Sequence, residues 1–132
     1  MTSTNADCPC GSARRYPDCC GRWHAWPAPD AEALMRSRYC AFVLRDAGYL
    51  RATWHPDTCP GDPLGEADGA RPTWLGLQVK WHRGEGDGAE VEFVARYRVG
   101  GGRAVRLHER SRFVREDGRW FYVDGFMPRA RT

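Results

Sequence analysis

Four cysteines lie close together near the start of the chain, and their spacing is typical of a metal site. Residues 8–21 have the sequence CPCGSARRYPDCCG. Four thiolates this close together can surround one tetrahedral ion, and soft sulfur ligands select zinc over magnesium or calcium. The segment has few apolar residues, so metal binding must supply much of its folding energy. We therefore predict a closed, structural Zn²⁺ site formed by Cys8, Cys10, Cys19 and Cys20.

Three other interpretations of these cysteines are weaker. Two disulfides, or free thiols, are disfavoured because thiols stay reduced in the cytoplasm, where we expect the protein to act. An iron–sulfur cluster uses the same ligands at different spacings. His24 lies four residues after Cys20 and is an alternative fourth ligand. The sequence leaves that choice open.

The composition excludes several classes of protein. The chain has 132 residues and a net charge of +3, and Lys80 is its only lysine. The basic residues are spread along the chain, which does not favour nucleic acid as a partner. No apolar stretch approaches the roughly 18 residues of a membrane span, and residues 1–7 lack the apolar core of a signal peptide. We therefore predict a cytoplasmic protein with no membrane partner.

The rest of the chain divides into helices followed by strands. Asp30 is a predicted N-cap for a helix over residues 31–46, and a second short helix is predicted over 49–54. Residues 56–72 are rich in Pro and Gly and predict a loop. Period-two patterns follow over 74–81, 91–99, 105–113 and 119–126. In the first of these, Leu75, Leu77, Val79 and Trp81 are predicted to share the apolar face.

Short turn sequences separate the four predicted strands. They lie at residues 84–88, 100–102 and 117–118, and all contain Gly. Such connections predict hairpins, and hence an antiparallel meander. Helices that cover one face of this sheet give an α+β fold.

Longer motifs resemble known families. Cys8-Pro9-Cys10-Gly11-Ser12, Tyr16 and Cys19-Cys20 resemble the SEC-C zinc-binding motif, which is also found at the C-terminus of the SecA translocation ATPase, although Ala13 replaces the usual Gly. The sequences MRSRYCAFV at 35–43, TWHP at 53–56, WLGL at 74–77 and ERSRF at 109–113 resemble the YchJ family of uncharacterised bacterial proteins. The resemblance implies a SEC-C motif over residues 1–26 and an NTF2-like domain over 30–128, a cone of helices on a bent antiparallel sheet.

Glu109 is a charged residue in an apolar series. Val105, Leu107 and Phe113 share its phase, so the pleat directs it to the concave face of the sheet. A buried carboxylate needs a partner, and Arg36 and Arg38 on the first helix are candidates. Glu109 then forms a buried ion pair that specifies the fold, or a polar anchor at the base of a pocket. A register slip of one residue would instead expose Glu109.

Trp54 and His55 form a second group of interest. Together with Arg36, Arg38 and Glu109 they form the predicted pocket. His55 and Glu109 are the candidates for catalysis, and no other catalytic residue is predicted. A His at a helix end more often caps the helix than acts as a general base. Cys40 is predicted to be a small buried residue and His108 a solvated one. Arginines on the opposite sheet face are predicted to form a solvated surface partly balanced by Glu92.

Two functions are compatible with these features. In the first, the zinc knuckle is an interaction or adaptor module that docks a protein or ribosomal partner. In the second, the cone binds a small-molecule ligand, or acts as an enzyme, through Glu109, Arg38 and His55. The chain shows no nucleophile–base pair or phosphate-binding loop, so an enzyme would be argued from fold analogy alone. Metal transfer is disfavoured because a closed four-thiolate site holds its ion.

Overall fold

The chain folds into an α+β structure with a small cysteine-bearing segment at its start. The structure, a computed structural model, describes residues 7–24, 27–65 and 71–128. Two short 3-10 helices, η2 (Tyr16–Asp18) and η3 (Cys20–His24), belong to the cysteine segment. They are followed by α1 (Ala31–Leu44), α2 (Ala47–Ala52), β1 (Pro72–Glu85), β2 (Gly88–Val99), β3 (Val105–Glu116) and β4 (Arg119–Phe126).

Aspartates begin both α-helices. The Asp30 carboxylate accepts a hydrogen bond from the Ala33 backbone N–H at 2.8 Å, as the predicted N-cap requires. Helix α1 ends at Leu44 and is followed by the C-cap Arg45, whose φ of 60° is left-handed. Asp46 then caps α2 through the Tyr49 N–H at 3.0 Å. The second helix therefore begins two residues earlier than its predicted start at Tyr49, because the local side-chain cap sets its first turn.

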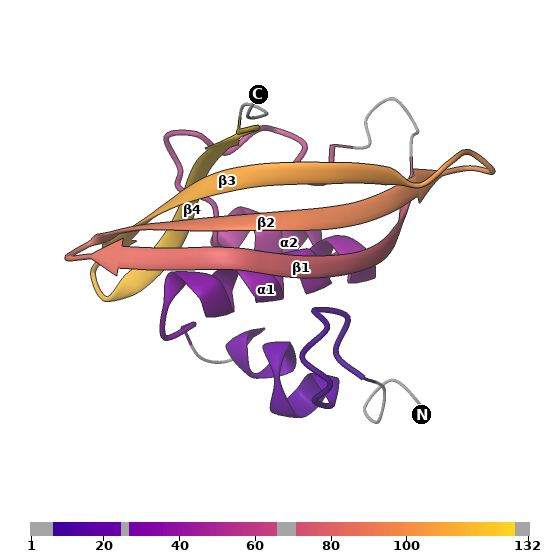
Figure 1. Cartoon of the computed structure of the whole chain (residues 1–132). Helices are drawn as coiled ribbons and strands as arrows, with labels where there is room; N and C mark the ends of the chain where they lie inside the picture. Colours follow the sequence, from indigo (N-terminus) through magenta and orange to yellow (C-terminus); the bar gives the residue numbers. More distant parts are fainter. Residues whose placement is uncertain (1–6, 25–26, 66–70, 129–132) are drawn as a thin grey trace.

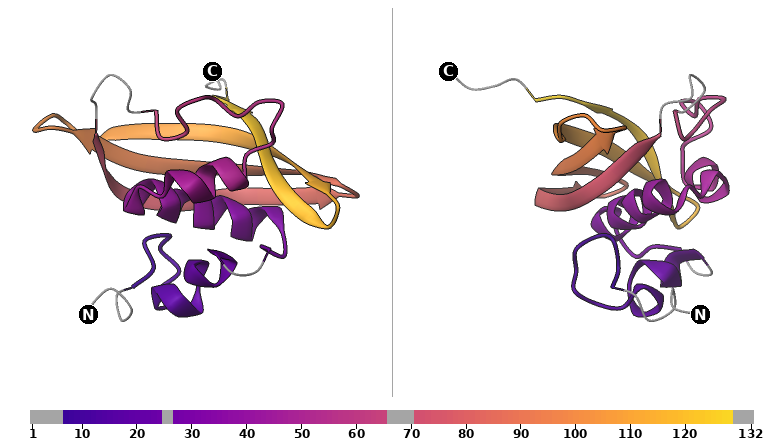
Figure 2. Two further views of the ribbon diagram at one scale, coloured as in Figure 1. Left: turned by 180° about the vertical axis from the view of Figure 1, so that it is seen from behind. Right: turned by 90° about the vertical axis from the view of Figure 1, so that its right-hand side faces the viewer.

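The four strands form an antiparallel meander in the order β1-β2-β3-β4, as predicted. Positive φ values at Gly86, Gly100, Asp117 and Gly118 lie in the three hairpin turns. Figures 1 and 2 show a long, curved sheet with α1 and α2 across one face. The cysteine segment lies on the side of α1 away from α2, so α1 contacts both parts of the protein. No helix in the described part of the chain has the length and apolar character that a membrane span needs.

Two irregularities in β1 change which side chains face the helices. The register with β2 shifts between Trp74 and Gly76 and again between Val79 and Trp81. Trp74 consequently packs on Tyr39 of α1, with ring centroids 5.7 Å apart, while Leu75 is 43% exposed. Trp81 lies beside the outer-face Arg110, whose guanidinium is 4.9 Å from its ring. The predicted apolar face was therefore wrong at Leu75 and Trp81, because a β-bulge reverses the alternation.

The outer face of the sheet carries a small charge network. Glu92 accepts from Arg110 at 3.1 Å, and its other oxygen lies 2.7 Å from His108 Nε2. The predicted balancing role of Glu92 is therefore confirmed. His108 is hydrogen-bonded to Glu92 rather than free in solvent, because the antiparallel register places the two residues close together.

This network predicts an acid-dependent loss of stability. The hydrogen bond from His108, followed by that from Arg110, lowers the pKa of Glu92 below its ordinary value. A carboxyl group with a lower pKa in the folded state stabilises the fold above its unfolded-state pKa, and this contribution disappears as the pH falls through the folded value. Between about pH 5 and pH 3, the unfolding free energy of the native chain should fall by about 1 kcal/mol more than that of Glu92→Gln. Urea titrations at each pH measure this difference, and Glu85→Gln, at an exposed position, is the control. An equal fall in unfolding free energy in all three chains would contradict the prediction.

Candidate functional site: a cysteine cluster and an aromatic cavity

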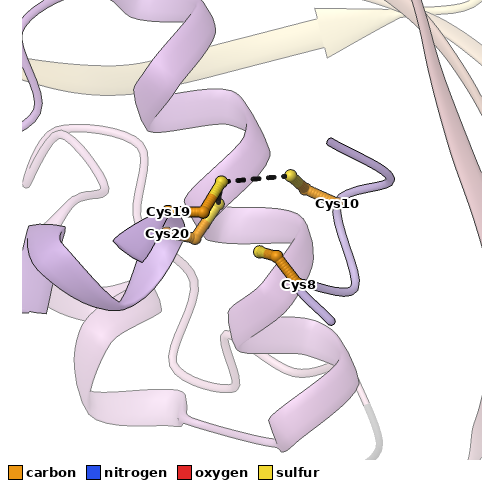
Figure 3. A group of neighbouring side chains, drawn as sticks. All are labelled: Cys8, Cys10, Cys19 and Cys20. Atoms are coloured by element: carbon orange, nitrogen blue, oxygen red, sulfur yellow. Dashed lines mark hydrogen bonds between the residues drawn. The ribbon is translucent and has the colours of Figure 1, made fainter. Parts of the chain in front are cut away.

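The four predicted zinc ligands come together in the structure. The sulfur atoms of Cys8, Cys10, Cys19 and Cys20 all lie within 4.8 Å of one another, and all four residues are buried. Figure 3 shows their side chains converging from two segments, with Cys8 and Cys10 on one and Cys19 and Cys20 on the other. All six cysteines of the chain are free thiols, so no disulfide replaces the predicted cluster.

The spacing of the sulfurs fits one tetrahedral ion. A zinc–sulfur bond of about 2.3 Å gives about 3.8 Å between any two ligands of a tetrahedron. The distances are 3.7 Å from Cys10 to Cys19 and 4.0 Å from Cys19 to Cys20. The cluster is therefore compatible with metal binding.

Backbone turns hold the two cysteine pairs at these positions. The Cys8 N–H donates to the Arg14 carbonyl at 2.8 Å, and Gly11 adopts a φ of +86° that favours glycine. Ser12 adds a hydroxyl 3.1 Å from the Cys19 sulfur. Only the backbone of His24 is described, within η3, so its role as an alternative ligand lies outside the described side chains.

A fifth cysteine joins the cluster from helix α1. Cys40 is fully buried, as predicted, but its sulfur lies 3.4 Å from that of Cys8. Cys40 was predicted only to be a small buried residue, and this contact with Cys8 was not predicted. No local motif signals it, because the contact joins residues 32 positions apart.

A cavity of about 260 Å³ lies on the other side of α1, between this helix and the concave face of the sheet. Its walls are mainly aromatic, from α1, β1, β2 and β3. They are formed by Tyr39, Phe42, Trp74, Phe93 and Phe113. A concave, mostly apolar site with a few polar groups is the usual form of a small-molecule site.

Arg38 supplies the positive charge of this cavity. It is only 5% exposed, and its Nη1 donates to the Leu50 carbonyl at 2.9 Å and to the Thr53 hydroxyl at 2.8 Å. Its guanidinium lies 4.7 Å from the ring of Trp54 and 4.5 Å from that of Tyr122. Among the described residues it makes no ion pair. Burial lowers the pKa of Arg38 to about 10, so it stays charged at neutral pH.

Glu109 lies at the same cavity but is not the ion-pair partner of Arg38. Its Oε2 accepts from the Ser111 hydroxyl at 2.7 Å and from the Tyr122 hydroxyl at 3.3 Å. Burial, and then the nearby Glu109 charge, raise the pKa of Tyr122, so that it remains a donor. A Cβ at Gly125 would overlap the Glu109 carboxylate, so this glycine makes room for it. The predicted ion pair is replaced by hydroxyl donors, and the polar-anchor interpretation fits the geometry.

Arg36 and His55 lie away from the cavity, contrary to prediction. Arg36 is two positions before Arg38, so the helix turns it toward the cysteine segment, where it donates to the Cys10 carbonyl at 3.2 Å. His55 follows α2, and its ring packs near Phe121 outside the cavity, with ring centroids 6.1 Å apart. Its Nε2 lies 2.9 Å from Glu116, and its Nδ1 accepts from the Asp57 N–H. Both ring nitrogens are occupied, which leaves His55 without a free base position.

Trp54 lines the cavity, as predicted, and carries an unsatisfied donor. Its indole Nε1 is buried and has no hydrogen-bond partner among the described residues. Buried donors without partners are rare in folded proteins and call for an explanation. The Trp54 ring meets the Tyr122 ring edge to face, with centroids 5.1 Å apart, and both rings lie beside the Arg38 guanidinium at the cavity.

These features define an NTF2-like α+β domain that carries a SEC-C motif. Residues 30–125 match the family described as YchJ, middle NTF2-like domain, and residues 5–22 match the SEC-C motif. A UPF0225 protein of Bordetella pertussis is 59% identical over 128 residues, which cover 93% of this chain and 94% of that protein. A UPF0225 protein of Xanthomonas campestris is 58% identical over 125 residues, which cover 92% and 96%. The chain belongs to the YchJ family.

Solved structures agree with this assignment. A SEC-C motif containing protein from Rhodopseudomonas palustris superposes with a TM-score of 0.83 at 37% identity, covering 94% of this chain and all of that one. A second one, from Psychrobacter arcticus, gives a TM-score of 0.73 at 28% identity, covering 100% and 88%. The predicted family and fold are thereby confirmed.

Proposed function

We propose that this protein binds a small, largely apolar molecule in the cavity between α1 and the sheet. The observation that carries the proposal is Arg38, whose buried guanidinium lies beside an aromatic cavity and has no anionic partner among the residues the structure describes. A buried charge is costly unless it is paired. A ligand group that accepts hydrogen bonds from Arg38 would lower that cost.

Two charged groups at the cavity, Arg38 and Glu109, define the chemistry of this ligand. Arg38 suits a carboxylate or another anionic acceptor. Glu109, which already accepts two hydroxyl bonds, suits a hydroxyl or amine donor of the ligand. The cavity is smaller than the roughly 300–1,000 Å³ of sites for drug-sized molecules. We infer a compact hydroxy acid or amino acid with a flat or branched apolar body.

The cysteine cluster has a structural role in this proposal. The cluster would hold Zn²⁺ through Cys8, Cys10, Cys19 and Cys20. The ion would cross-link the segment, and with four protein ligands it would have no open coordination position for a substrate. Helix α1 then connects the two sites, because it carries Cys40 and Arg36 toward the cysteines and Arg38 toward the cavity.

Calorimetric titration with three matched probes tests the proposal. The probes are 4-hydroxybenzoate, which has an acceptor and a donor, 4-methylbenzoate, which keeps the acceptor, and 4-methylphenol, which keeps the donor. We expect 4-hydroxybenzoate to bind most tightly and the phenol, which cannot neutralise Arg38, to bind about 10–100-fold more weakly. Absence of binding by all three would contradict the proposed function, and equal affinities would contradict the proposed ligand chemistry.

The docking of a protein or ribosomal partner through the cysteine segment stays a prediction. The exposed Arg14 and Arg22 on that segment favour a partner with negative charge. A pull-down experiment compares how much partner the native chain and Arg14→Glu capture. Equal amounts of captured partner would contradict docking through this surface.

A further inference from the structure

The metal centre has five thiols for four coordination positions. Cys40 shares one buried cluster with Cys8, Cys10, Cys19 and Cys20, and it is completely inaccessible to solvent. Its sulfur is 3.4 Å from that of Cys8, which is closer than the 3.7 Å between Cys10 and Cys19. Cys40 therefore lies within hydrogen-bond distance of one predicted ligand and in the same buried cluster as the other three.

Cys40 differs from the other four in the element that carries it. The quartet belongs to a segment of turns and 3-10 helices, whereas Cys40 lies inside α1, a helix of 14 residues capped by Asp30. The packing of α1 against the sheet, through residues such as Leu34 and Met35, positions this thiol without help from a metal. A thiol held by the main domain stays beside the centre when part of the cysteine segment moves away.

We propose that Cys40 is a reserve ligand that takes the coordination position of Cys8 when the Cys8 sulfur leaves. The two sulfurs are within S–H···S distance, so with an ion bound Cys40 would give its proton to the departing Cys8 thiolate and would hold the ion in its place. One thiolate becomes a thiol and one thiol becomes a thiolate, so the charge of the centre is unchanged. The ion would then stay attached to α1 while residues 7–10 are released.

Cobalt substitution tests this exchange, because the thiolate-to-cobalt absorption reports how many sulfurs bind the ion. We expect Cys8→Ser, and equally Cys8→Ala, which offers no oxygen ligand, to keep the intensity per cobalt of the native chain. Cys8→Ser combined with Cys40→Ser should lose about one quarter of it. Cys19→Ser should lose the same fraction even with Cys40 present, since Cys40 contacts Cys8 rather than Cys19. Cys59→Ser, a control in the loop after α2 and outside the cysteine cluster, should change nothing.

Zinc affinity gives an independent measurement on the same variants. In competition with a chromophoric chelator, we expect Cys8→Ala to weaken zinc binding less than about tenfold, and Cys8→Ala with Cys40→Ser to weaken it at least about a hundredfold. A loss of one thiolate in both Cys8 single variants would overturn the proposal. So would a loss of one thiolate in Cys40→Ser alone, because Cys40 would then be a permanent ligand.

Discussion

Removal of the metal should release residues 8–23 and leave the sheet folded. Backbone hydrogen bonds within the described cysteine segment lie in short turns, such as Cys8 N–H to the Arg14 carbonyl and Cys19 N–H to the Tyr16 carbonyl. The main domain has its own core around Leu34, Val91 and Phe113. For a segment of this kind, the free energy of metal binding supplies the free energy of folding.

Hydrogen exchange measured by mass spectrometry follows both parts at once. Treatment with a chelator, or the Cys10→Ser substitution, should speed amide exchange in residues 8–23 by at least about a hundredfold. Strands β2 and β3 should exchange within about tenfold of their native rate. Unchanged protection of the cysteine segment after chelation would contradict a metal-dependent segment. Simultaneous loss of protection in the sheet would contradict an independent main domain.

Arg38→Met should separate ligand binding from stability. Met retains much of the volume of the Arg38 stem but offers no hydrogen bond to the ligand, so affinity for 4-hydroxybenzoate should fall about 10–100-fold. Two effects on stability oppose each other. The substitution removes an unpaired buried charge, and it also removes the donors to Leu50 and Thr53. We therefore expect a change of at most about 2 kcal/mol in unfolding free energy.

Arg36→Met is the matched control for this experiment. It makes the same chemical change on the same helix, but Arg36 donates to the Cys10 carbonyl and to Glu32 rather than facing the cavity. Its affinity for the probe should equal that of the native chain. If Arg38→Met and Arg36→Met weaken binding equally, the effect belongs to helix α1 or to net charge, and the assignment of Arg38 to the binding site is wrong.

Short-range patterns predicted the elements and the cysteine cluster. The Asp30 cap, the glycine-containing turns and the thiol spacing are each encoded within a few neighbouring residues, so they can be recognised from the sequence. Glu109 was also placed correctly on the concave face, because β3 is regular between Leu107 and Ser111.

The details of the site depended on contacts between distant residues. Two register shifts in β1 brought Trp74 inward and turned Trp81 outward. The two hydroxyl partners of Glu109, and the contact of Cys40 with Cys8, depend on how elements pack. Periodicity cannot specify these contacts, because a single bulge or helix rotation changes them.

The most direct test of the cavity proposal is the side-chain nitrogen spectrum of the arginines during titration with 4-hydroxybenzoate. The Arg38 Nε–H signal is identified by its absence in Arg38→Met. We predict that this signal shifts with a saturable dependence on probe concentration while the signal of Arg36 stays in place. A stationary Arg38 signal, or equal shifts of exposed arginines such as Arg14 and Arg22, would contradict binding in the cavity.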